Sequence, residues 1–136
     1  MESYYPDTTS EYPNEERVSL KREVYSLLED AGTEDWDDEG ILALAPETVA
    51  VAQKLIDEFP PHVSRPDVNA TPHGEVDFDW VIDRDVMLTI SVGPSKEIAF
   101  AGLFHGARLN GCEPWEGMLP QFANYCFERL REAQSL

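Results

Sequence analysis

Two neighbouring segments, residues 75–82 and 86–92, alternate apolar and polar side chains with a period of two. Successive residues of a β-strand point to opposite faces of a sheet, so this period predicts two strands with one apolar face each. The apolar positions are Val76, Phe78, Trp80, Ile82, Val86, Leu88, Ile90 and Val92. Because a one-faced antiparallel sheet buries its apolar side against another layer, the chain is expected to form a layered fold.

The sheet is expected to extend beyond these two strands. The polar residues 83–85 form the first predicted turn, and residues 93–96, which contain glycine and proline, form the second. Residues 97–103 are a third predicted strand, and a fourth strand over about 105–109 is left open. The sequence therefore predicts an antiparallel meander of three or four strands.

Three other segments have apolar residues at the three- and four-residue steps of an amphipathic helix. The first is expected to begin at Asn14, a favourable N-cap, and to end at Gly32. The second begins at Pro46 and is stopped by the prolines at 60–61, and the third covers about 115–133. The order ααβββ(β)α predicts an α+β two-layer sandwich in which the helices cover the meander.

The chain is expected to contain one domain, residues 14–136, preceded by an arm at residues 1–13. The arm contains two prolines and the tyrosines Tyr4, Tyr5 and Tyr12, without periodicity, and is predicted to be flexible. The start of the chain has no basic and apolar signal sequence, and no segment has the apolar length of a membrane span. Two widely spaced cysteines, Cys112 and Cys126, read as free thiols, so a cytoplasmic location is expected.

Acidic residues greatly outnumber basic ones: 27 Asp and Glu face 10 Lys and Arg, for a formal net charge of -17. The excess is uneven, because residues 1–40 hold 13 acids and 3 bases whereas residues 94–136 hold 5 and 4. Such a field repels nucleic acids and anionic membranes and speeds encounter with basic partners. The composition therefore predicts a basic protein partner and argues against direct binding of nucleic acid or membrane.

The polar face of the first strand carries Glu75, Asp77 and Asp79. Residues two apart on a strand are separated by about 7 Å, which is close to the spacing of successive phosphates in a nucleic-acid strand. One interpretation is that this face imitates nucleic acid, and the alternative is an ordinary solvated strand face. The predicted partner-binding residues are Glu75, Asp77 and Asp79 on the strand, Asp35, Asp37, Asp38 and Glu39 in the loop after the first helix, and Tyr4, Tyr5 and Tyr12 in the arm.

The loop acids resemble the opening of a calcium-binding EF-hand loop, with Asp35, Asp37 and Glu39 at positions one, three and five and Gly40 at position six. Position twelve is Pro46 instead of a bidentate glutamate. No metal site and no cofactor are therefore assigned. The three histidines and two cysteines form no metal or catalytic spacing either, so the chain is predicted not to be an enzyme.

Several short motifs resemble those of a loosely defined family of small, uncharacterised bacterial proteins. They include Trp36-Asp37-Asp38-Glu39-Gly40, Pro46-Glu47-Thr48, Phe59-Pro60-Pro61, Pro66-Asp67-Val68 and the Thr-Pro-x-Gly-Glu-Val segment at residues 71–76, followed by Trp80. The resemblance covers about residues 36–104. It implies a bacterial or phage origin and no established activity, and it transfers no site residues.

These features together predict an acidic, non-enzymatic inhibitor or neutralising partner of a basic, nucleic-acid-handling protein. An antitoxin, an immunity protein and an anti-CRISPR-like phage protein all fit, with a toxin, a nuclease or a CRISPR effector as the partner. The alternative is a small hydrolase or transferase with an acidic, metal-dependent site. A further alternative is a structural subunit that dimerises through its near-neutral C-terminal helix.

Overall fold

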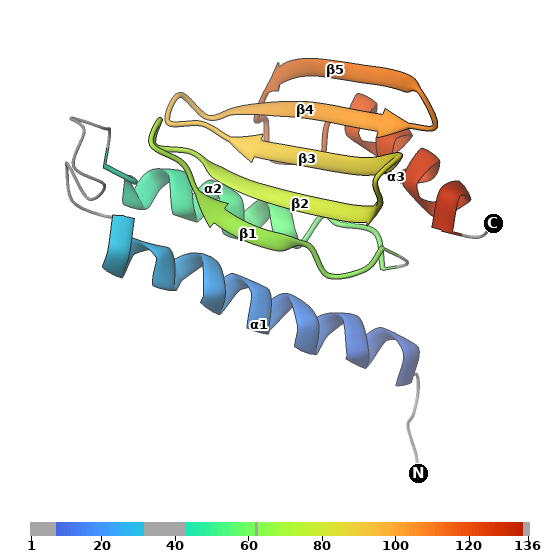
Figure 1. The fold of residues 1–136 in the computed structure, drawn as a ribbon. Helices are drawn as coiled ribbons and strands as arrows, with labels where there is room; N and C mark the ends of the chain where they lie inside the picture. Colours follow the sequence, from blue (N-terminus) through green and yellow to red (C-terminus); the bar gives the residue numbers. More distant parts are fainter. Residues whose placement is uncertain (1–7, 32–42, 62, 135–136) are drawn as a thin grey trace, which may run out of the picture.

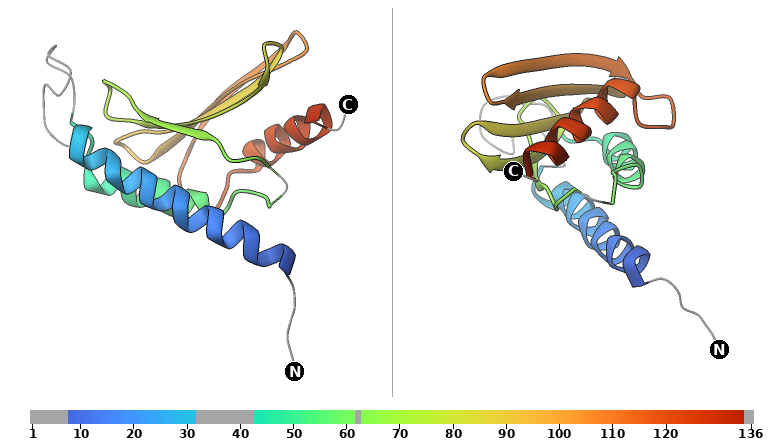
Figure 2. Two further views of the ribbon diagram at one scale, coloured as in Figure 1. Left: turned by 60° about the horizontal axis from the view of Figure 1, so that its bottom comes forward. Right: turned by 90° about the vertical axis from the view of Figure 1, so that its right-hand side faces the viewer.

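The structure, a computed structural model, describes residues 8–31, 43–61 and 63–134. It contains the helices α1 (Thr8–Ala31), α2 (Pro46–Ile56) and α3 (Gln121–Gln134), and the strands β1 (Asp67–Ala70), β2 (Val76–Asp83), β3 (Val86–Val92), β4 (Glu97–Phe104) and β5 (Ala107–Pro114). The three helices lie on one side of the sheet, and no described helix covers the other face (Figures 1 and 2). The predicted α+β class is confirmed.

The sheet is an antiparallel meander with the strand order β1-β2-β3-β4-β5. The predicted count of three or four strands is therefore too low. The sequence analysis missed β1 because four residues between prolines are too short to show a period of two. It also placed the last strand too early, since His105 and Gly106, with φ values of 52° and 93°, form the turn and β5 follows them.

Three helix boundaries differ from the prediction, and one of them is the end of α2, which lies at Ile56 instead of at the prolines 60–61. Helix α1 begins at Thr8 instead of Asn14, so residues 8–13 of the predicted arm are helical. The sequence places Glu11 in the first turn of this helix, where the helix dipole favours a negative charge. Helix α3 begins at Gln121 instead of about residue 115, because Gly117 has a φ of 94° and Pro120 precedes the first turn.

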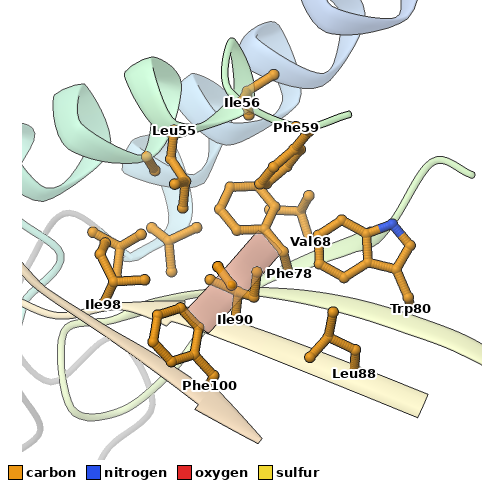
Figure 3. Close-up of a cluster of buried hydrophobic side chains, with 14 of the residues drawn as sticks. Leu55, Ile56, Phe59, Val68, Phe78, Trp80, Leu88, Ile90, Ile98 and Phe100 are labelled. Carbon is orange, nitrogen blue, oxygen red and sulfur yellow. The ribbon is translucent and has the colours of Figure 1, made fainter. Parts of the chain in front are cut away.

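The core lies between the inner face of the sheet and the helices, and aromatic rings form its centre (Figure 3). The ring of Phe59 lies 5.2 Å from Phe78, 5.1 Å from Trp80 and 5.7 Å from Phe127, measured between centroids. The Nε1–H of Trp80 donates to the backbone oxygen of Ser64 at 2.7 Å, so the one polar atom of the indole is satisfied. Trp80 belongs to the core, as its place in the alternation predicts.

Helix α1 packs on α2 and on the edge strand β1. Its residues Leu20 and Val24 are buried, and the Arg17 guanidinium donates to the carbonyls of Ile56 and Phe59 at the end of α2. A cation at this position satisfies carbonyls that lack a partner within the helix. The two helices therefore form one unit beside β1.

Candidate protein-binding surface

The uncovered side of the sheet, called here the open face, includes three rows of residues that cross four or five strands each. Directly opposed residues of antiparallel strands point to the same face, so the strand register defines each row. The first row contains Asp67, Asp79, Thr89, Ala101 and Asn110, the second Asn69, Asp77, Ser91, Ala99 and Cys112, and the third Val81, Met87, Leu103 and Arg108. The sequence placed Asp77 and Asp79 on this face, and the structure surrounds them with specific neighbours.

Two hydroxyl groups orient the acids of β2. The Oγ of Ser91 donates to Oδ1 of Asp77 at 2.6 Å, and the Oγ1 of Thr89 donates to Oδ1 of Asp79. Each donor lies on β3 directly opposite its acceptor. The two carboxylates, called here the acid pair, are therefore held upright on the sheet by neighbours that carry no charge.

The acid pair has no cationic neighbour on the strands. Burial raises the pKa of the Asp77 carboxyl, the charges of Asp79 and Glu75 raise it further, and the hydrogen bond from Ser91 lowers it. Among the strand residues, all of which the structure describes, Arg108 is the only basic one, and it stands on β5 at the end of the third row. The negative charge at Asp77 is thus concentrated and uncompensated, which costs free energy in the folded protein.

This arrangement predicts a pH-dependent gain in stability for Asp77→Asn. The folded protein retains the Asp77 proton to a higher pH than the unfolded chain does, so its free energy of unfolding falls as the pH rises through this titration. Asparagine keeps an acceptor for Ser91 and removes the charge. The variant is expected to be more stable than wild type at pH 7, by less than about 1 kcal/mol because the site is partly solvated, and no more stable in acid.

Urea unfolding at a series of pH values measures this difference. Asp85→Asn in the exposed β2–β3 turn is the matched control. A variant that loses stability at pH 7 would contradict the inference that the Asp77 charge is uncompensated.

Glu75 lies in the turn that leads into β2. The Oγ1 of Thr71 donates to Oε1 of Glu75 at 3.2 Å and accepts the backbone N–H groups of His73 and Glu75. The charge of Glu75 raises the pKa of Asp77, so the three predicted strand acids are neighbours. Asp67 of β1, opposite Asp79, adds a fourth acid that the sequence analysis missed together with its strand.

The structure does not describe the side chains of the other predicted binding residues. Asp35, Asp37, Asp38 and Glu39 of the loop, and Tyr4 and Tyr5, lie outside the described residues. Tyr12 falls within helix α1 instead of an extended arm, and its side chain is not described. The candidate surface is therefore defined by the sheet alone.

Three apolar residues of the third row were also missed. Val81 is 62% exposed, and its register partners Met87 and Leu103 are half-buried. The sequence contains a signal for them, because Val81 and Met87 occupy positions of the alternation that are otherwise polar. We call Val81, Met87 and Leu103 the apolar row.

The described residues offer no grouping suited to metal chemistry, since no three His, Cys, Asp or Glu side chains among them converge. Burial raises the pKa of Cys126 to about 11, although the nearby charge of Arg129 acts in the opposite direction. Cys112 is exposed, but partial desolvation of its thiol and the adjacent carboxylate of Glu97 both raise its pKa. Its sulfur lies 3.7 Å from Oε1 of that glutamate. Both thiols are therefore poor nucleophiles at neutral pH.

Comparison of the chain with protein families, with curated proteins and with solved structures finds no match. Among the described helices, none combines the length and the apolar character that crossing a bilayer requires. The function is therefore inferred from the geometry of the open face.

Proposed function

We propose that this protein binds a basic, nucleic-acid-handling protein through the open face of its sheet and neutralises it. The observation that carries the proposal is the uncompensated acid pair, whose carboxylates are oriented by Ser91 and Thr89, and in which the charge of Asp79 destabilises that of Asp77. A lysine or arginine of a partner would relieve this repulsion. Relief of an existing cost adds to the attraction between the two proteins.

The overall charge supports the same class of partner. A net charge of -17 attracts a basic surface over distances limited by salt, about 8 Å at physiological ionic strength. An antitoxin, an immunity protein and an anti-CRISPR-like protein each act in this way on a toxin, a nuclease or a CRISPR effector. The unpaired state of Cys112 and Cys126 supports action in the reducing cytoplasm.

Nucleic-acid mimicry is the mechanism we propose for the neutralisation. The acid pair stands at a spacing of about 7 Å along β2, near that of successive phosphates. Groups held at this spacing on a rigid sheet would fill positions that the partner uses for its own nucleic acid. A partner that binds its DNA or RNA and this protein at the same time would exclude mimicry.

Charge reversal tests the proposed function. The double variant Asp77→Lys/Asp79→Lys is expected to weaken capture of the partner from a host lysate by more than about tenfold, because attraction becomes repulsion. Mass spectrometry identifies the partner, and titration against the purified partner gives the dissociation constant.

The matched control is Glu29→Lys/Glu132→Lys, which makes the same change in net charge at exposed residues of α1 and α3. Circular dichroism verifies folding, and Asp77→Asn/Asp79→Asn supplies a neutral variant if the lysines disturb the sheet. Equal capture by the open-face and control variants would mean that the open face is not the interface.

A further inference from the structure

The apolar row has no role in a purely electrostatic interaction. Val81, Met87 and Leu103 are neighbours on β2, β3 and β4, and strands lie about 4.8 Å apart, so the row spans about 10 Å across the sheet. Isolated exposed apolar residues are common on protein surfaces. A contiguous row on an uncovered face is less common and is typical of a binding site.

The acid pair and the apolar row lie in line along β2. Asp79 lies two residues before Val81, and Asp77 lies four residues before it. Along the strand, these carboxylates are therefore about 7 and 14 Å from Val81. In the rows of the acid pair, β3 carries Ser91 and Thr89, and the next strand, β4, carries the small residues Ala99 and Ala101. Along β2, the open face therefore presents two negative charges followed by an apolar residue. The small side chains on the neighbouring strands leave these groups accessible to a partner.

This pattern matches the side-chain spacing of an α-helix. A helix rises about 1.5 Å per residue, so residues i, i+4 and i+8 share a face at intervals of about 6 Å. We propose that the open face binds a basic amphipathic helix of the partner along β2 and β3. Two Lys or Arg residues one turn apart meet the acid pair, and an apolar residue one turn further along packs on the apolar row.

The charge and shape of the face favour this occupant over others. A flexible polybasic segment would meet Asp77 and Asp79 but would leave the apolar row in water. A second copy of this chain would bring acid pairs together and would carry the same net charge of -17. The inference rests on the proposed function, since it names the element of the basic partner that the same surface binds.

Three synthetic peptides of equal charge and length test the inference. The first is a helical peptide with Lys at i and i+4 and Leu at i+8, repeated once. The second has the same composition in an order that separates Lys and Leu onto opposite helix faces, and the third replaces every Leu by Gln. The first is expected to bind at least about tenfold more tightly than the other two, because only it buries apolar surface on Val81 and Met87.

Variants of the apolar row locate the binding. Val81→Thr/Met87→Gln is expected to remove the preference for the first peptide and to leave binding of the third unchanged. The matched control, Val18→Thr/Met118→Gln, makes the same chemical changes at exposed residues of α1 and of the loop before α3.

Three results would overturn the inference. Equal affinity for all three peptides would mean that charge alone governs binding, and the proposed function would stand without the helix. Retained preference in Val81→Thr/Met87→Gln would place the apolar contact elsewhere. A concentration-dependent doubling of mass that this variant abolishes would identify a second copy as the occupant. Failure of the Asp77→Lys/Asp79→Lys test, in contrast, removes the proposed function itself.

Discussion

Substitution of Trp80 by alanine is expected to lower the free energy of unfolding by about 3–5 kcal/mol. The side chain is 1% exposed, and its ring lies 5.1 Å from Phe59 and 5.2 Å from Phe127. Alanine would leave a cavity between α2, α3 and the sheet, and it would remove the hydrogen bond from Nε1 to the Ser64 carbonyl. Urea unfolding followed by far-UV circular dichroism measures the loss without depending on the fluorescence of the deleted ring.

The variant Trp80→Phe separates packing from hydrogen bonding. It retains an aromatic ring beside Phe59 and lacks the Nε1–H donor, so we expect it to lose about 1–2 kcal/mol. If Trp80→Ala lowers the free energy of unfolding by no more than the loss of about 1–2 kcal/mol expected for Trp80→Phe, the surrounding rings collapse into the space. In that case the aromatic cluster would be less tightly determined than its geometry indicates.

The second large effect is expected for Val24→Asp. Val24 is fully buried on α1, in the layer that faces α2. A carboxylate placed there lacks a cation or a water shell, and such burial costs several kcal/mol. Because α1 is attached through one face of its helix, we expect it to detach while the sheet and the other helices stay folded.

Hydrogen–deuterium exchange distinguishes this local release from global unfolding. The amides of α1 should exchange rapidly in Val24→Asp, whereas those of β2, β3 and β4 should stay protected. Ser19→Asp, an exposed position of the same helix, is the control and should leave α1 protected. Loss of protection throughout the sheet would show that α1 is required for the whole fold.

The two faces of β2 link stability to the proposed function. Trp80 anchors the inner face, and its neighbours Asp79 and Val81 stand on the open face. Because the strand is held by rigid aromatic contacts below, the acid and apolar groups above it keep fixed positions. The spacing proposed for helix binding therefore depends on the core, and substitutions such as Asp77→Asn change the charge of the face without touching that core.

The local pattern of the sequence was sufficient for the fold class and for part of the surface. The period of two in residues 76–92 places Phe78 and Trp80 inside and Asp77 and Asp79 outside, because the side-chain alternation of a strand is a local property. The apolar spacing after Pro46 likewise predicts α2. These elements could be predicted because each one carries its own periodicity.

The tertiary structure decided the remaining features, which depend on pairing between distant segments. Strand β1 exists because Asp67–Ala70 pairs with β2, and four residues carry no period of their own. The partners of the acid pair, Ser91 and Thr89, and the union of Val81, Met87 and Leu103 into one row follow from the register, which the turns and the shared core set together. The sequence by itself thus determined which residues face outward, and only the packed sheet determined which of them stand side by side.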